Sequence, residues 1–192
     1  MTICIYAASS NELREEYFTA ARRVGELLAA GGHAMVYGGG SSGLMGACAQ
    51  GLLSRGGTLT GIAPRFFDEG DFLLKDEGTF VFTDTMAQRK TMMEDMADAF
   101  IILPGGVGTM EEFFETLTLR LLGSHSKPIA LLNTLGYYDA LYAFIRASID
   151  GGFTARSCLE MIELCCSPEQ AVSAVCRPRG EAPARSINEY GK

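Results

Sequence analysis

Short apolar runs alternate with longer amphipathic segments along most of the chain. Runs of four or five apolar residues indicate buried strands, and helix-length stretches with apolar residues every three or four positions indicate helices. The expected strands are 3–7, 34–37, 58–63, 79–83, 99–103, 128–132 and 161–165. The expected helices are 11–30, 43–55, 86–96, 108–122, 137–150 and 168–175, with a short one near residue 155. Strands that alternate with helices predict a parallel sheet covered on both faces, which is a doubly wound α/β fold.

Turn and capping signals mark the ends of these elements. Asn11 is the expected N-cap of the first long helix, and Gly31 and Gly32 form its stop. The stretch 65–78 is the longest expected loop. A chain of 192 residues has the length of one domain, which we place at 1–176. The tail 177–192 is rich in Pro, Arg, Gly and Glu, and we expect it to be disordered.

The first of two glycine-rich turns lies between the second strand and the following helix. Its glycines, Gly38-x-Gly40-x-x-Gly43, fit the dinucleotide fingerprint GxGxxG. The acidic residue that normally follows about 20 positions later is absent, and the segment 61–64 occupies its place. We therefore favour a glycine-lined floor beneath a nucleotide over a nicotinamide or flavin cofactor. A tight turn that merely lets helix and strand pack closely is the alternative.

The second glycine turn follows the apolar run 100–103 and contains Gly105, Gly106 and Gly108, with Thr109 behind them. A strand, a glycine loop and a helix N-terminus together make an anion site, because free N–H groups and the helix dipole point at one spot. No lysine precedes Thr109, so the loop is not a Walker A motif. A monophosphate fits this loop better than a triphosphate.

Two carboxylates, Glu111 and Glu112, lie in the first turns of the helix behind this loop. They would repel a phosphate unless they serve another part of the ligand. The pattern Thr109-x-x-Glu112 is also that of a capping box, so capping and catalysis are both open for Glu112. Glu115 and Thr118 follow on roughly the same helical face, where they either extend the site or bind water.

Arg89 and Lys90 form a basic pair near the start of another predicted helix. Cations there are unfavourable for the helix dipole, so the pair needs a compensating anion or solvent. A solvated surface position is the usual fate of such residues and stays open beside a functional one.

Charge and cysteine usage narrow the class of protein. A net charge of −7 argues against a nucleic-acid partner, whose phosphates need a basic face. No apolar run reaches the roughly 20 residues of a membrane helix, and the N-terminus lacks the basic region of a signal peptide. The six cysteines show no CxxC spacing, so we expect buried thiols in a reducing cytoplasm, with neither a metal site nor disulfides.

Three spaced motifs together resemble the LONELY GUY family of cytokinin riboside 5′-monophosphate phosphoribohydrolases, often mislabelled lysine decarboxylases. They are the segment 38–46, Met86-x-x-Arg89-Lys90, and Pro104-Gly-Gly-x-Gly-Thr-x-x-Glu112. The resemblance runs from about residue 3 to 175. It implies a Rossmann-like homodimer that hydrolyses the N-glycosidic bond of a nucleoside 5′-monophosphate to free base and ribose 5-phosphate, without a cofactor.

By the same resemblance, Arg89 and Glu112 match the catalytic pair. The candidate substrate-binding residues are Ser9, Gly39, Gly40, Gly43, Asp71, Met86, Lys90, Gly105, Gly106, Val107, Gly108, Thr109, Glu111 and Thr118. The chain departs from the family pattern at Ala8 and Ala87, and Asp71 stands in a changed context. These departures concern recognition of the base, so cytokinin-type and plain adenine bases both stay open.

Two rival functions are weighed against this one. A lysine decarboxylase needs pyridoxal phosphate on a Schiff-base lysine, and of four lysines only Lys90 is near a candidate site. A non-catalytic nucleotide sensor or carrier would need the phosphate loop but neither Arg89 nor Glu112. The motifs therefore favour the hydrolase.

Overall fold

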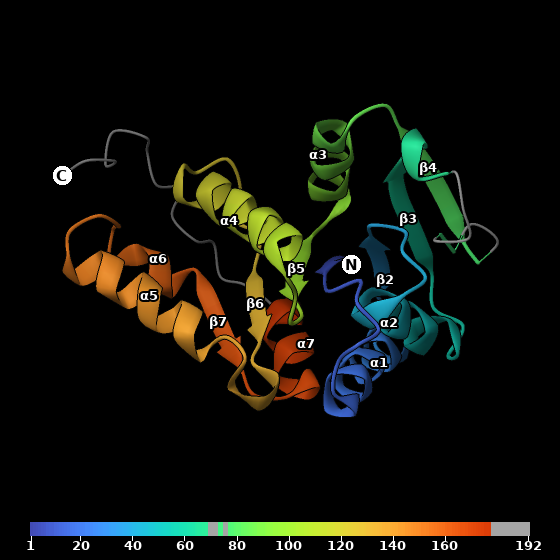
Figure 1. The fold of residues 1–192 in the computed structure, drawn as a ribbon, viewed down its shortest axis with the longest axis horizontal. Coiled ribbons are helices and arrows are strands. Elements are labelled where there is room, and N and C mark those ends of the chain that lie inside the picture. Colours follow the sequence, from blue (N-terminus) through green and yellow to red (C-terminus); the bar gives the residue numbers. More distant parts are fainter. Residues whose placement is uncertain (69–72, 75–76, 178–192) are drawn as a thin grey trace.

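Seven parallel strands form one sheet in the order β4-β3-β2-β1-β5-β6-β7 (Figure 1). The computed structural model describes residues 1–68, 73–74 and 77–177. The strands are β1 (Thr2–Tyr6), β2 (Ala34–Tyr37), β3 (Leu59–Pro64), β4 (Thr79–Thr83), β5 (Ala99–Ile102), β6 (Ile129–Leu132) and β7 (Ile162–Cys165). The helices are α1 (Glu15–Ala30), α2 (Gly43–Leu53), α3 (Met86–Met96), α4 (Val107–Leu121), α5 (Asp139–Asp150), α6 (Ser157–Glu160) and α7 (Pro168–Cys176), with 3₁₀ turns η1 (Arg65–Phe67) and η2 (Thr134–Gly136). The predicted doubly wound α/β fold is confirmed.

The strand order reverses beside β1, which pairs with β2 on one side and with β5 on the other. In open parallel sheets, ligands bind outside the carboxyl ends of the strands at such a switch point. Here the loops after β1 and β5 meet directly, because the Ala8 N–H donates to the Pro104 carbonyl at 3.1 Å. The Ala8 carbonyl in turn accepts from the Leu44 N–H at 2.9 Å, which ties in the start of α2.

Two apolar cores flank the sheet. One includes Val24, Leu28 and Leu52 and lies between the sheet and the helices α1, α2 and α7. The other includes Met93 and Phe113 and lies under α3, α4 and α5. Each core removes a row of strand side chains from water, which anchors α3 and α4 on the same face of the sheet.

Close packing of α1 on α2 depends on glycine. A Cβ atom on Gly25 would lie 2.0 Å from the Cys48 carbonyl oxygen, and one on Gly51 would lie 2.1 Å from the Arg22 carbonyl oxygen. The two helices therefore approach more closely than side chains would allow, which fixes where α2 begins relative to the loop after β1.

Some predicted helix starts are wrong. The helix α1 begins at Glu15, four residues later than predicted, and Asn11 does not cap it. The Asn11 side chain instead accepts the N–H of Gly43 at 2.8 Å and thus serves a distant helix. The helix α5 begins at Asp139 because the turn η2, with Leu135 at φ 56°, occupies the residues before it. The predicted single domain 1–176 stays a prediction, and most of the tail falls outside the described residues.

No helix within the described ranges is both long enough and apolar enough to cross a membrane.

Candidate functional site

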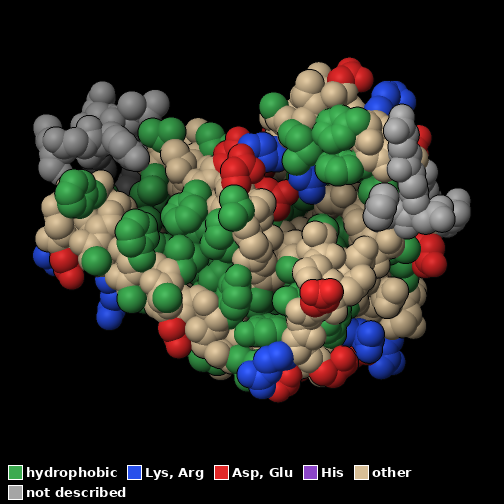
Figure 2. Space-filling view, in the orientation of Figure 1, with side chains coloured by type: hydrophobic (Ala, Val, Ile, Leu, Met, Phe, Trp, Pro, Cys, Tyr) green, Lys and Arg blue, Asp and Glu red, His purple; other side chains and the backbone are tan. Residues whose placement is uncertain are grey.

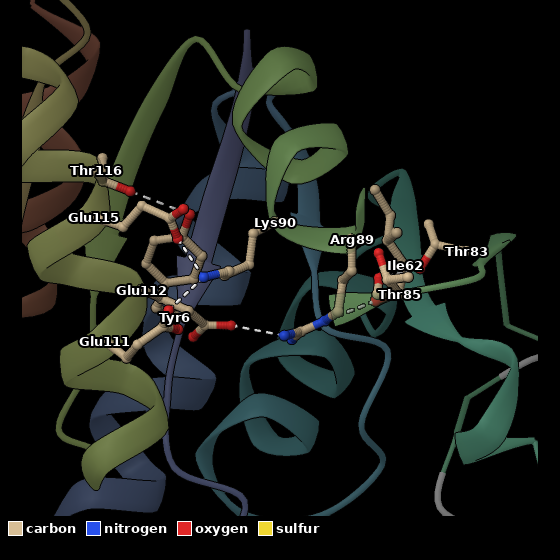
Figure 3. A network of polar contacts seen from close by, with 10 residues as sticks. All are labelled: Tyr6, Ile62, Thr83, Thr85, Arg89, Lys90, Glu111, Glu112, Glu115 and Thr116. Atoms are coloured by element: carbon tan, nitrogen blue, oxygen red, sulfur yellow. Dashed lines mark hydrogen bonds and ion pairs between the residues drawn. The ribbon is translucent and has the colours of Figure 1, made fainter. Parts of the chain in front are cut away.

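A buried ion pair joins α3 to α4 above the carboxyl ends of the strands (Figure 3). Arg89 on α3 donates from Nη1 to Glu112 Oε1 on α4 at 2.9 Å, and each residue is only 8% exposed. The Nε of Arg89 donates to the Ile62 carbonyl of β3 at 3.2 Å. The solvated-surface alternative for Arg89 is therefore wrong. Desolvation offsets much of the attraction between charges buried this deeply, so the pair is weak evidence for a stabilising role.

The sequence positions Arg89 by two local devices. A capping box at Thr85 and Gln88 starts α3, with the Gln88 N–H donating to Thr85 Oγ1 at 3.1 Å. The guanidinium then lies over Gly38, where a Cβ atom would be 2.0 Å from Arg89 Nη2. The first glycine of the GxGxxG pattern therefore makes room for Arg89, a role that the sequence analysis did not foresee.

The capping-box alternative for Glu112 is wrong. The helix α4 begins at Val107 with Gly106 as its N-cap and has no side-chain cap. Thr109 and Glu112 thus lie inside the helix, and the Glu112 carboxylate reaches Arg89 instead. Burial raises the pKa of Glu112 above its ordinary value, although the neighbouring Arg89 charge opposes this shift.

Lys90 is surrounded by acidic side chains of α4. Its Nζ pairs with Glu111 and lies 2.6 Å from Glu115 Oε2. Hydrogen bonds to Glu111 and then to Glu115 raise the pKa of Lys90, which keeps the ammonium charged. Figure 2 shows acidic and basic side chains gathered in a hollow between α4 and α3.

A second polar chain runs behind these pairs and was missed from the sequence. Thr116, fully buried, donates to Glu94 Oε1 at 3.2 Å and lies 3.3 Å from the Tyr6 hydroxyl. Burial raises the pKa of Glu94. Thr116 stands four residues after Glu112, so helical spacing could have indicated it. Thr118, which the sequence analysis had put on that face, is exposed, and its binding role stays a prediction.

The N-terminus of α4 is open. Gly106, Val107 and Gly108 are exposed, Val107 to 88%, and within the described ranges the N–H groups of these residues have no hydrogen-bond partner. Thr109 is buried against Gly105, where a Cβ atom would lie 2.2 Å from the Thr109 hydroxyl oxygen. Unpaired N–H groups at a helix start attract an anion.

The N-terminus of α2, behind the first glycine turn, differs. Asn11 accepts the Gly43 N–H, and the Ala8 carbonyl accepts those of Leu44 at 2.9 Å and Met45 at 3.3 Å. The chain thus satisfies these three donors itself, whereas the N–H groups at the start of α4 have no partner among the described residues and can bind an anion.

The other predicted binding residues lie in the first glycine turn, in the loop after β1 and at the start of α3. Ser9 is exposed in the loop after β1, and Met86 is exposed at the first position of α3. Gly39 and Gly43 have positive φ angles, and Gly40 forms an isolated bridge with Leu73. Each glycine therefore has a backbone or packing role, and the predicted contacts of this group with a ligand stay predictions. Asp71 lies outside the described residues.

Within the described part of the chain, no three His, Cys, Asp or Glu side chains come together as ligands of a metal ion.

Comparisons with known proteins agree on one family. The family described as "Possible lysine decarboxylase" matches residues 45–175. A cytokinin riboside 5′-monophosphate phosphoribohydrolase from Mycobacterium tuberculosis is 36% identical over 92% of this chain and 94% of its own length. The Arabidopsis thaliana protein of the same name, LOG2, is 39% identical over 83% of this chain and 75% of its own length.

Solved structures share the fold. The molybdenum cofactor carrier protein of Chlamydomonas reinhardtii superposes with a TM-score of 0.67 at 21% identity, covering 91% of this chain and 94% of the other. The molybdenum cofactor binding protein of Rippkaea orientalis gives a TM-score of 0.66, also at 21% identity, over 90% and 93%. At this identity the likeness concerns the fold alone.

Proposed function

The chain belongs to the family of cytokinin riboside 5′-monophosphate phosphoribohydrolases, whose sequences are also described as possible lysine decarboxylases, and from this premise we propose that it hydrolyses the N-glycosidic bond of a nucleoside 5′-monophosphate. Water adds to the ribose C1′ atom, the bond from C1′ to the base nitrogen breaks, and the base leaves with a proton. The products are the free base and ribose 5-phosphate.

The observation that carries the proposal is the placement of the Arg89–Glu112 pair one and a half helical turns beyond the open N-terminus of α4. The five residue steps from Val107 to Glu112 rise about 7.5 Å along the helix. A phosphate on the N–H groups of residues 106–108 would thus leave the sugar to extend along α4 toward Glu112. The glutamate would face ribose rather than phosphate, so charge repulsion does not arise.

In this arrangement Glu112 has the catalytic role. Breaking a ribosyl C–N bond develops positive oxocarbenium charge on the sugar, and a buried carboxylate stabilises that charge strongly. It also orients the attacking water or a ribose hydroxyl. Arg89 holds the carboxylate in place and keeps it ionised against the effect of burial. Binding energy at the phosphate then fixes the position of the sugar.

Lys90 follows Arg89 directly in the sequence, and its ammonium group pairs with Glu111 and Glu115. We assign it to binding rather than to Schiff-base chemistry, because its hydrogen-bonded carboxylates favour the charged ammonium, which is not nucleophilic. This supports the hydrolase over a decarboxylase.

A direct test is to incubate the protein with AMP and separate the products by chromatography. The proposal expects adenine and ribose 5-phosphate in equal amounts. Bound AMP that is recovered intact would instead indicate a nucleotide sensor or carrier, and would contradict the proposal.

We also propose that the protein is a homodimer, which the resemblance implies. Apolar side chains gather over α4 and α5 in Figure 2. Phe114 on α4, Phe144 on α5 and Phe153 just after α5 are exposed. Exposed apolar patches of this kind mark interaction surfaces. Sedimentation velocity should give a dimer for the wild type and a monomer for Phe144→Glu, and a monomeric wild type would contradict the proposal.

The buried thiols of Cys4, Cys48, Cys158 and Cys165 support the further proposal of a reducing, cytoplasmic location.

A further inference from the structure

Three consecutive carbonyl groups before α4 each accept a hydrogen bond. The Tyr138 hydroxyl donates to the Leu103 carbonyl at 2.6 Å, and the Ala8 N–H donates to the Pro104 carbonyl at 3.1 Å. The Tyr137 hydroxyl donates to the Gly105 carbonyl, also at 2.6 Å. Tyr138 and Ala8 belong to the core or its margin, but Tyr137 is 43% exposed, so its hydroxyl is not needed to fill the interior.

The bond to Gly105 fixes the direction of a donor on the other side of the same peptide group. The Gly105 carbonyl and the Gly106 N–H belong to one planar trans peptide, in which C=O and N–H point in opposite directions. With the carbonyl held toward Tyr137, the Gly106 N–H points away from Tyr137. Both flanking residues are glycines, whose wide range of backbone angles permits this peptide to rotate. A rotated peptide would present a carbonyl oxygen where the anion site needs a donor.

Tyr137 is itself held in an unusual turn. Leu135 has a φ angle of 56°, which is strained for a residue with a side chain, and Gly136 has a φ angle of 74°. Asn133 braces the turn: its side chain donates to Asp139 Oδ1 at 2.7 Å and accepts the Tyr138 N–H at 2.7 Å. The Tyr137 ring packs edge-on against Tyr17, with ring centroids 6.1 Å apart. The strained turn at Leu135 thus places the Tyr137 hydroxyl against the Gly105 carbonyl of the glycine loop.

We propose that Tyr137 is a positioning residue, whose hydrogen bond to the Gly105 carbonyl holds the Gly106 N–H toward the phosphate of the substrate. The proposal rests on the proposed function only in that the ligand carries a phosphate at the start of α4. It assigns Tyr137 to phosphate affinity and not to the chemical step.

The test compares Tyr137→Phe with Tyr17→Phe, which removes the hydroxyl of the neighbouring ring and leaves the Gly105 bond intact. The probe is ribose 5-phosphate, titrated by calorimetry without turnover. Its dissociation constant should rise at least about fivefold in Tyr137→Phe, the loss expected for one hydrogen bond, and stay within about twofold in Tyr17→Phe. The KM for AMP should rise by the same factor while kcat is unchanged, because the phosphate is bound equally in ground and transition states.

Turnover of adenosine separates a positioning role from a structural one. If Tyr137 were merely structural, its loss would lower activity on adenosine as well as on AMP. Adenosine lacks the phosphate, so its kcat/KM should be the same in Tyr137→Phe and wild type. Unchanged affinity of Tyr137→Phe for ribose 5-phosphate, an equal loss on adenosine, or a wild type that does not bind ribose 5-phosphate would each overturn the proposal. A wild type that binds ribose 5-phosphate but leaves AMP intact refutes the hydrolase instead, and the affinity comparison still decides the role of Tyr137.

Discussion

Gly38 and Arg89 are in direct contact: a Cβ atom at position 38 would lie 2.0 Å from Arg89 Nη2. The atoms that it would displace are the far end of a flexible side chain, and the φ angle of Gly38 is not positive. An alanine here can therefore be accommodated by moving the guanidinium. That movement would break the geometry of the Arg89–Glu112 pair.

We expect Gly38→Ala to lower kcat/KM for AMP at least about tenfold while the protein stays folded. A tenfold loss corresponds to about 1.4 kcal/mol of transition-state stabilisation. Arg89→Lys is the reference variant, because lysine keeps the charge but loses the planar fork that reaches both Glu112 and Ile62. It should lower turnover roughly 100-fold.

The matched control is Gly31→Ala. A Cβ atom there would likewise meet the end of a side chain, 2.8 Å from His33 Cδ2, but at the far end of α1. Normal activity in Gly31→Ala with reduced activity in Gly38→Ala supports the role of Arg89. Near-normal turnover in both Gly38→Ala and Arg89→Lys would show that Arg89 has no part in the reaction.

Glu112→Gln should abolish hydrolysis and keep the fold. Glutamine has nearly the same shape, and no cap is lost, because Glu112 does not cap α4. The loss of charge removes the main stabilisation of the oxocarbenium ion, so turnover should fall at least about 100-fold. Glu16→Gln, which removes an exposed partner of Arg14, should leave turnover unchanged. Residual activity above roughly one-tenth of wild type in Glu112→Gln would exclude a catalytic role.

The pH dependence follows from the raised pKa of Glu112. The carboxylate must be ionised to stabilise a positive sugar, so kcat/KM should fall as pH drops through that pKa. The midpoint of this acid limb should lie above the ordinary glutamate value of 4.5. In Arg89→Met it should move to still higher pH, because the arginine charge lowers the pKa. A midpoint at or below the ordinary value would contradict the assignment.

The same shift affects stability with a defined sign. A carboxyl group whose pKa is higher in the folded state binds protons more tightly there than in the unfolded chain. Its contribution to the free energy of unfolding is therefore present at low pH and is lost as pH rises through the raised pKa. Chemical denaturation of wild type and Glu112→Gln across that range would measure this contribution.

Most of the fold could be predicted because each element carries its own local signal. The start of α3 was placed correctly, and Thr85 and Gln88 form a capping box there. Asn11 shows the limit of such signals. It has the residue type of an N-cap, but its side chain binds the Gly43 N–H, 32 residues away, and only the folded chain brings the two together.

The candidate site shows the same division. The motifs singled out Arg89 and Glu112, yet residue types alone could not separate a cap from a catalytic group. The decision depends on a contact between α3 and α4 that spans 23 residues. Gly38 was recognised as a turn residue, but its contact with Arg89 requires β2 and α3 to be in place. Tyr6 and Thr116 were missed because neither lies in a recognisable motif. Their hydroxyl groups form a hydrogen bond only after folding brings residues 110 positions apart together.

AMP and adenosine should be compared at equal enzyme concentration, with adenine release as the signal, because they differ only in the phosphate. In the proposed mechanism the free N–H groups at the start of α4 hold the phosphate, and the Arg89–Glu112 pair acts on the sugar. We expect kcat/KM for AMP to exceed that for adenosine at least about 100-fold, because adenosine lacks the charge-assisted contacts at the start of α4. Equal values for the two substrates, or no adenine from AMP, would contradict it.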